Sequence, residues 1–427
     1  MKINKIIKSH ILSQVVDKGR RKIGIEVECF VYTKNYKRLS VNPSKGYSAI
    51  DLLHDLNNIS KKENGSYSLE PGGQIEWSSP PFEDIRDLEK SIHSYKKAID
   101  SVLEKKGLSS LYIGVEPFFD PDSIDLIKQK KYQLMNLNME KRGTLGKWMM
   151  RNTSSIQLNY DIIDENDLEA VMFVADCIHP ISAYLFSNSP FQLGKPVGEN
   201  NLRNHIWEDT DTTRCRTLFD HRINQPEHLL DLYIEFMMEV PGIFQLDGNL
   251  VIQDTDLTLG KDLKKKLING KIRSEDIEAA LHQIFTNVRL KSLIEIRDID
   301  CLPFNHILAP VAFFTGLISD NSIRDQLINE FLSWSPQDRK HWNKIALKLD
   351  ADQIGPKKRK FMQWIKWAGE IAIEGLQKRN LDETKYFLEY YQNVIDNGSL
   401  SIQRQNDFLS SGKTLEKYIF EKIVDTS

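Results

Sequence analysis

Four short stretches of the chain alternate polar and apolar residues, and each contains a polar pair two positions apart. Residues i and i+2 of a strand project from the same face, so each stretch can bury aliphatic side chains on one face and present polar groups on the other. The pattern therefore predicts four strands with one polar face. The pairs are Glu26 and Glu28 in IGIEVECF, Gln74 and Glu76 in GGQIEWS, Gln157 and Asn159 in SIQLNY, and Glu295 and Arg297 in LIEIRD.

Helical spacing of apolar residues predicts helices between and after these strands. The expected helices are an amphipathic one at the N-terminus, one near 47–58, a long one at 83–106, a buried one at 164–188, and an almost wholly helical region from about 320. LYIGVEPFF at 111–119 is expected to form a strand, QLDGNLVIQ at 245–253 a hairpin, and the polar segment 201–216 a loop.

The order of these elements indicates one α+β domain over residues 1–427, with helices packed outside the strands. The 427 residues contain no internal repeat, low-complexity segment or Pro/Gly-rich linker that would divide them. A content of 40% hydrophobic and 27% charged residues is ordinary for a globular chain with a sizeable core.

Charge and apolar run length limit the classes of partner. A net charge of −3 gives no basic footprint of the kind that nucleic-acid-binding proteins carry. The longest nearly uncharged apolar stretch, residues 306–318, is too short to span a bilayer. We therefore expect a cytoplasmic protein that binds neither nucleic acid nor membrane, with its four scattered cysteines reduced.

Carboxylates dominate the expected polar face. A turn at Pro71-Gly72-Gly73 places Glu70 at the end of one strand, close to the next polar pair. Several acids on one face repel one another unless cations neutralise them, and all-oxygen ligand sets favour Mg²⁺ or Mn²⁺ over zinc. A nearby arginine suits a phosphoryl group. Each pair alone could be the solvated side of an ordinary strand, but four pairs rich in Glu, Gln and Asn favour a site.

Six motifs along the chain resemble the glutamate–cysteine ligases of the plant and proteobacterial type, in the order found in that family. The resemblance covers about residues 20–320. The motifs are GIEVE at 24–28, LEPGGQIEWSSPP at 69–81, KYQLM at 131–135, GTLGKWMMRNTSSIQLNYD at 143–161, RNHIWEDTDTTRC at 203–215 and LIEIRDID at 293–300.

The resemblance implies a glutamine-synthetase-like fold, in which a curved, mainly antiparallel sheet forms a funnel. It also implies that ATP phosphorylates the γ-carboxylate of L-glutamate and that the amine of L-cysteine attacks the acyl phosphate. The product would be γ-glutamylcysteine, the first intermediate of glutathione or a related thiol, made by a monomer or homodimer.

Residue roles follow by position in the matched motifs. Arg297 matches the arginine that faces the phosphates. The implied metal positions are Glu26, Glu28, Glu70, Glu76, Glu295 and Gln157; the substrate positions are Arg151, Arg203, Asn159 and Trp207; the nucleotide positions are Gln74 and Arg214.

Two alternatives stay open. The sequence after Arg214 departs from the family pattern, so a ligase of the same fold could use a different amine acceptor. A catalytically silent relative that only binds glutamate or nucleotide is a second possibility. The intact acids and Arg297 argue against it, because a decayed site should have lost some of them.

Overall fold

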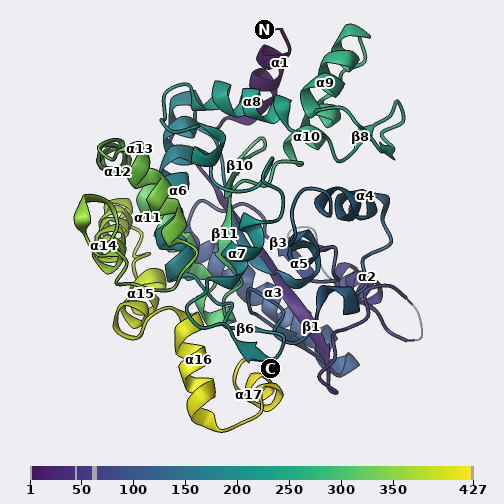
Figure 1. The fold of residues 1–427 in the computed structure, drawn as a ribbon, viewed down its shortest axis with the longest axis vertical. Coiled ribbons are helices and arrows are strands. Elements are labelled where there is room, and N and C mark those ends of the chain that lie inside the picture. Colours follow the sequence, from purple (N-terminus) through teal and green to yellow (C-terminus); the bar gives the residue numbers. More distant parts are fainter. Residues whose placement is uncertain (1, 44–45, 60–64, 425–427) are drawn as a thin grey trace.

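A seven-stranded sheet runs through the centre of the computed structural model, with helices around it (Figure 1). The structure describes residues 2–43, 46–59 and 65–424. The strands are β1 (Ile23–Thr33), β2 (Ser66–Leu69), β3 (Ile75–Ser78), β4 (Leu108–Leu111), β5 (Ser155–Tyr160), β10 (Val288–Leu290) and β11 (Ile294–Asp300). Their order is β10-β11-β5-β1-β3-β2, with β4 paired to β1, and the pairs are antiparallel.

The register of the sheet brings the polar pairs together. Glu28 lies opposite Glu76 on β3, and Glu26 lies opposite Gln157 on β5. On the next strand, β11, Glu295 lies opposite Asn159. The prediction of four strands with one shared polar face is therefore confirmed.

The opposite face of the sheet is the main core. Alternate residues such as Val27 on β1, Leu158 on β5 and Ile296 on β11 are fully buried there. Helix α6 (Glu165–Leu185) packs against β11. Helix α11 (Leu308–Ile318) packs against α14 (Phe361–Arg379) and α15 (Lys385–Asn397) in the layer beyond.

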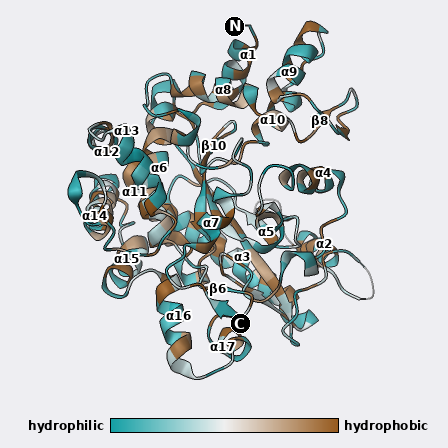
Figure 2. Ribbon diagram, in the orientation of Figure 1, coloured by the Kyte–Doolittle hydropathy of each residue, from teal (hydrophilic) through white to brown (hydrophobic). Residues whose placement is uncertain are grey.

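The remaining helices surround this core, as the apolar spacing predicts. Each buries one side, so hydrophobic and hydrophilic residues alternate along most of them (Figure 2). They are α1 (Lys2–Ile11), α2 (Ala49–Ile59), α3 (Ile85–Lys106), α4 (Lys130–Met139), α5 (Gly146–Asn152), α7 (Leu202–Glu208), α8 (Leu229–Glu239), α9 (Leu259–Ile268), α10 (Ser274–Leu281), α12 (Asn321–Leu332), α13 (Pro336–Ile345), α16 (Leu400–Ser411) and α17 (Leu415–Lys422).

Strand β1 changes character along its length. Beyond Glu28 its polar face becomes aromatic, with Phe30 and Tyr32 fully buried. These rings form a second hydrophobic cluster with Tyr418 and Ile419 of the C-terminal helix α17. One strand therefore connects the carboxylates to the packing of the chain end.

Two local predictions are wrong. Strand β4 ends at Leu111, because Gly114 N donates to Asn188 O, and beyond it Val115 forms only an isolated antiparallel bridge with Thr153. The segment 201–216 is a loop only in part. Its first half forms α7, where Leu202 and Ile206, four residues apart, are buried on one helix face.

Other local predictions are confirmed. The expected hairpin forms between β8 (Gln245–Leu246) and β9 (Ile252–Gln253), and a second short pair is β6 (Phe191–Gln192) with β7 (Lys195–Pro196). The four cysteines are free and buried.

Helix α6 has the length and composition of a helix that could cross a membrane. In the structure, 94% of its apolar window is buried within the fold. The central helix of a globular core gives the same signal, so composition alone carries little weight here.

Candidate active site

A cavity of about 230 Å³ opens on the polar face of the sheet. Both acids and cations line it. The acids are Glu26, Glu28, Glu70 and Glu76, and the cations are Lys131 on α4, Arg203 on α7, Arg289 on β10, and Lys291 and Arg297 beside or on β11. The cavity thus collects charges of both signs from strands, helices and turns far apart in the sequence.

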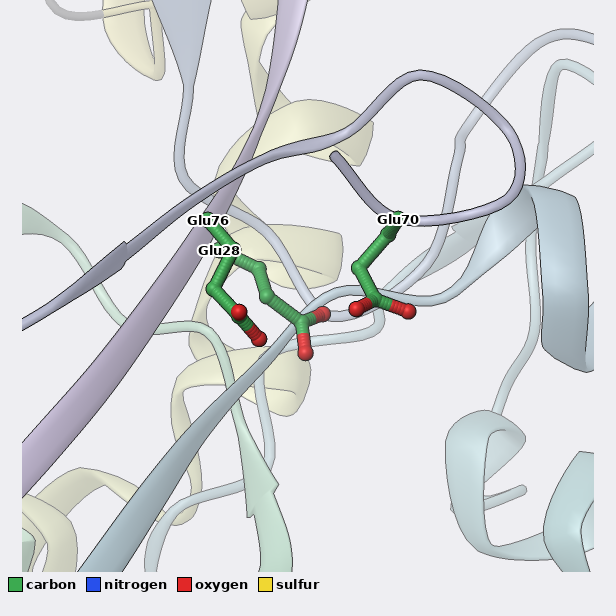
Figure 3. A group of neighbouring side chains, drawn as sticks. All are labelled: Glu28, Glu70 and Glu76. Atoms are coloured by element: carbon green, nitrogen blue, oxygen red, sulfur yellow. The ribbon is translucent and has the colours of Figure 1, made fainter. Parts of the chain in front are cut away.

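Three of the acids form a cluster. Glu28, Glu70 and Glu76 each place a carboxylate oxygen within 4.8 Å of the others, and Figure 3 shows the side chains converging. Strand pairing sets Glu28 against Glu76, and the turn after β2 brings in Glu70. Gly73 adopts a φ of +78° in that turn, a conformation that glycine accepts without strain.

Hydrogen bonds fix the orientation of two cluster members. Glu28 accepts bonds from Ser155 N at 2.8 Å, Ser155 Oγ at 2.9 Å and Gln157 Nε2 at 3.0 Å. Ser68 Oγ donates to Glu76 Oε1 at 2.6 Å. Carboxylates held in this way are organised in advance for a ligand.

Burial and mutual repulsion raise the pKa of all three carboxyls. Burial, and then Glu76, raise the pKa of Glu28 to about 7. Burial and Glu28 raise the pKa of Glu70 to about 7, and burial and Glu70 raise the pKa of Glu76 to about 8. A divalent cation would relieve this repulsion, and the all-oxygen donor set suits a hard ion such as Mg²⁺ or Mn²⁺.

Glu295 has a different environment. Its carboxylate contacts Arg289 Nε at 2.5 Å, Lys291 Nζ at 2.5 Å and Arg297 Nη1 at 2.7 Å. Burial alone would raise its pKa, but these three cations outweigh burial and hold the pKa well below its usual range. Glu295 thus lies outside the three-carboxylate cluster and anchors the cations beside it.

Glu26 and Asn159 lie next to each other between these two groups. Asn159 Nδ2 donates to Glu26 Oε1 at 3.2 Å. Burial, and then Glu295, raise the pKa of Glu26. Glu26 lines the cavity, whereas Asn159 does not.

Arg297 connects the two charged groups. Its Nη1 donates to both Glu295 and Gln157 Oε1, and its backbone lies in a β-bulge between Ile296 and Ile299. Arg203 Nη2 donates to the Arg297 carbonyl at 3.0 Å, while Arg203 Nε is buried with no hydrogen-bond partner. The indole of Trp207 lies within 6 Å of both guanidinium groups.

Not every residue implied by the motifs reaches the cavity. Gln74 lines it, with Nε2 bonded to Thr153 O and Oε1 unpartnered. Arg151 is absent from the lining, because its guanidinium bonds to Pro121 O and to Asn136. Arg214 is fully buried elsewhere, paired with Asp211 at 2.8 Å.

The structure also adds residues that the sequence interpretation missed. Arg289 and Lys291 are two positions apart, like the four polar pairs, but three-residue β10 is too short for the alternation to stand out. Lys131 lies in the matched KYQLM motif without an assigned role. Ser68 and Ser155 give no signal in a single sequence, because serine is common in strands and turns alike.

The chain resembles known proteins over most of its length. Residues 22–419 match the family model described as glutamate-cysteine ligase family 2, so the match extends into the helical C-terminal region. A chloroplastic glutamate–cysteine ligase of Arabidopsis thaliana is 31% identical over 351 residues, 78% of this chain and 66% of the relative. One of Medicago truncatula is 29% identical, covering 92% of this chain and 80% of the relative.

Solved structures show the same fold. A glutamate–cysteine ligase of Francisella tularensis in complex with AMP has a TM-score of 0.62 at 12% identity, covering 95% of this chain and 88% of that chain. A bifunctional glutathione synthetase of Pasteurella multocida has a TM-score of 0.52 at 10% identity, covering 97% of this chain and 52% of that one. With the family match over residues 22–419, the chain belongs to glutamate–cysteine ligase family 2.

Proposed function

We propose that this protein is an ATP-dependent ligase that joins the γ-carboxylate of L-glutamate to the amine of L-cysteine. The observation that carries the proposal is the cluster of Glu28, Glu70 and Glu76 facing Arg297 in one cavity, in a chain of this family. The product, γ-glutamylcysteine, would be the first intermediate of glutathione or a related thiol.

The chemistry has two steps. A γ-carboxylate oxygen of glutamate attacks the terminal phosphorus of ATP, and ADP leaves as the β–γ bridging bond breaks. The amine nitrogen of cysteine then attacks the acyl carbon and loses a proton. The bond between the acyl carbon and the phosphate oxygen breaks, and inorganic phosphate leaves. Both steps need charge neutralisation and alignment more than covalent help from the protein.

The cavity contains groups suited to each need. Glu28, Glu70 and Glu76 would hold a divalent cation, which supplies neutralisation of the phosphate charge when bound. Arg297 is kept charged by Glu295 and presents a rigid guanidinium for the transferred phosphoryl group. Gln157 accepts from Arg297 and donates to Glu28, so it aligns the cation-binding group with the phosphoryl-binding group.

The nucleotide phosphates are best placed against the cations that line the cavity. Lys131, Arg289 and Lys291 all line it. Glu295 neutralises part of the positive charge of Arg289 and Lys291. Arg289 Nη1 also donates to His282 O and Ile284 O, both at 3.4 Å, so the Lys291 ammonium is the less engaged of the two groups.

The direct test is turnover of the purified protein with ATP, Mg²⁺ and glutamate, to which single amino acids are added while ADP and product mass are measured. We expect ADP and γ-glutamylcysteine with cysteine. No ADP above background with any amine would contradict the ligase assignment. Turnover restricted to amines other than cysteine would favour a ligase of the same fold with another acceptor.

A further inference from the structure

Glu70 is held differently from the other two members of the carboxylate cluster. Glu28 and Glu76 belong to strands, and hydrogen bonds fix both of their carboxylates. Glu70 follows β2 and reaches the cluster from the turn before β3 (Figure 3). No group in the described ranges donates a hydrogen bond to its carboxylate. The position of the Glu70 carboxylate therefore depends on the backbone of the turn.

The carbonyl of Gly72 attaches this turn to a side chain from another segment. Within the turn, Glu70 N donates to Gln74 O at 3.0 Å, and Gly73 N donates to Glu70 O at 2.9 Å. The Gly72 carbonyl takes part in neither bond. It accepts a hydrogen bond from Arg38 Nη2 at 2.8 Å.

Other contacts also hold the turn, but they come from the backbone or from the turn itself. Ile127 N donates to Pro71 O at 2.9 Å. The side chain of Gln74 donates through Nε2 to Thr153 O at 2.7 Å. The bond from Arg38 is thus a contact that a substitution outside the turn can remove.

A buried acid fixes the guanidinium of Arg38. Arg38 follows β1 and pairs with Tyr32 in an antiparallel bridge. Its Nη1 donates to Glu116 Oε2 at 2.9 Å, and the side chains of Arg38 and Glu116 are 8% and 0% exposed. The Tyr32 hydroxyl and Phe118 N both donate to Glu116 Oε1. The guanidinium also lies 4.5 Å from the centre of the Phe30 ring, so its orientation is well defined.

The shape of arginine is needed for both contacts of residue 38. The two terminal nitrogens of one guanidinium diverge, so Nη1 bonds Glu116 while Nη2 bonds Gly72 O. A lysine ammonium is a single compact charge, which can keep the ion pair but cannot reproduce the fork. If the ion pair were the whole role of Arg38, lysine would replace it without affecting the carboxylate cluster.

We propose that Arg38 is a positioning residue, which holds the turn through the Gly72 carbonyl and thereby keeps the Glu70 carboxylate in place for a divalent cation. Arg38 is not among the residues that line the cavity, so it acts on the cation through the turn. The assignment rests on the part of the proposed function that gives the carboxylate cluster to a cation.

A double-mutant cycle between Arg38→Lys and Glu70→Gln tests this role through the binding of Mn²⁺. Electron paramagnetic resonance of the free ion gives the Kd for Mn²⁺ in wild type, in both single variants and in the double variant. We expect Arg38→Lys to raise the Kd about tenfold, as for the loss of one hydrogen bond from a charged group. In the Glu70→Gln background the same substitution should change the Kd by less than about twofold, because the carboxylate that Arg38 positions is gone.

Arg324→Lys is the matched control. Arg324 is also buried, pairs with Asp167 at 3.1 Å and donates to the main-chain carbonyl of Ile318, but it lies outside the cavity. Its Kd for Mn²⁺ should equal that of wild type. Thermal denaturation of each variant checks the fold.

Arg38→Ala provides a second measurement. Its Kd for Mn²⁺ should rise at least as much as in Arg38→Lys. Added guanidinium ion should then lower the Kd again, because it can occupy the space between Glu116 and the Gly72 carbonyl. The same addition should leave the Kd of Glu70→Gln unchanged.

Three results would overturn the assignment. The first is equal weakening of Mn²⁺ binding by Arg38→Lys in both backgrounds, and the second is an unchanged Kd in the single variant. The third is loss of folding in Arg38→Lys together with no effect of guanidinium on Arg38→Ala, since residue 38 would then serve the fold alone.

The two proposals fail separately, because Mn²⁺ binding requires no turnover. A tenfold effect that Glu70→Gln removes, in a protein that forms no ADP with any amine, would retain the role of Arg38 and reject the ligase. Normal turnover with an unchanged Kd in Arg38→Lys would retain the ligase and reject the role of Arg38.

Discussion

Arg297 is the residue on which the charge balance of the cavity depends. Its guanidinium contacts Glu295 directly and is linked to Glu28 of the carboxylate cluster by hydrogen bonds through Gln157. Two other cations remain on Glu295 if Arg297 is removed. Loss of Arg297 should therefore affect the phosphoryl group more than the fold.

We expect Arg297→Ala to lower kcat/KM by about a thousandfold or more, the range found for arginines that stabilise phosphoryl transfer. The measurement is steady-state ADP formation in the presence of glutamate and cysteine, with far-ultraviolet circular dichroism to check the fold. Arg273→Ala is the control, because Arg273 also pairs with a buried acid, Asp276, but lies outside the cavity. An active Arg297→Ala enzyme would contradict the assigned role.

The raised pKa values of the carboxylate cluster predict how pH affects metal binding. A cation must displace protons that Glu28, Glu70 and Glu76 retain near neutral pH. The Kd for Mg²⁺ should therefore fall as pH rises from about 6 to about 9, with proton release on binding. Calorimetry in buffers of different ionisation enthalpy measures both quantities. A Kd for Mg²⁺ that does not change with pH, with no proton release, would contradict the raised pKa values.

The same protonation predicts the stability of the metal-free chain. The folded pKa values, about 7 to 8, exceed the ordinary value of 4.5 for an unfolded glutamate. The stability that these groups contribute is then fully present below pH 4.5 and is lost as pH rises through 7 to 8. Thermal denaturation should show a lower Tm at about pH 9 than at about pH 6 and a smaller difference in Glu76→Gln.

At the scale of elements, the turn between β2 and β3 sets the position of Glu70. A Cβ added at Gly72 would lie 2.5 Å from Arg151 Cα and 2.6 Å from Arg151 O, both backbone atoms that cannot rotate away. The turn therefore packs directly on the end of α5. Gly72 has no side chain, so the turn and α5, which both border the site, can approach each other closely.

We expect Gly72→Ala to destabilise the fold by about 1–3 kcal/mol and to weaken Mg²⁺ binding, because the turn and Glu70 must shift. Urea denaturation and calorimetric titration give the two values. Gly248→Ala provides the comparison, because a Cβ there meets nothing within 4 Å. If both variants bind Mg²⁺ like wild type, the close approach does not position Glu70.

The sequence predicts elements well where the apolar period is long or the polar alternation is clear, as in β1, α3 and α6. It fails where a contact distant in sequence ends or starts an element. Gly114 N bonds to Asn188 O, which ends the regular pairing of β4, and α7 forms because Leu202 and Ile206 meet a separate cluster of buried residues. Neither contact is visible in a single sequence.

Some residues of the site can likewise be predicted from the sequence, and others cannot. Strand periodicity and motif matching find Glu28, Glu76 and Arg297, because these residues share one face of the sheet. Arg151 and Arg214 lie in equally good motifs, yet their guanidinium groups turn to internal partners. Direction of a side chain from a helix or loop depends on packing, which the motif alone does not encode.

At the scale of the whole molecule, the C-terminal helix α17 closes the structure against β1. Ile419 is fully buried in the cluster with Phe30 and Tyr32, on the same strand face that carries Glu28. The chain end therefore covers the apolar continuation of the polar face. Its packing should contribute to the stability of the central sheet.

Ile419→Ala is expected to lower the free energy of unfolding by about 2–4 kcal/mol, the cost of a cavity at a buried aliphatic position. Leu409→Ala is the matched control, because Leu409 is 68% exposed and should change stability by less than about 0.5 kcal/mol. Chemical denaturation of both variants measures the difference. Equal changes in the free energy of unfolding in the two variants would show that Ile419 of α17 does not contribute to the hydrophobic core.

Strand β1 also couples cation binding at Glu28 to the packing of α17, which lies near the other end of the sequence. Ligands that bind only the folded form stabilise every segment whose opening disrupts their site. A cation held by Glu28 should thus slow the detachment of α17, although the helix never touches it. Native-state hydrogen exchange or limited proteolysis at the C-terminus would then report, from a distance, whether the carboxylates are occupied.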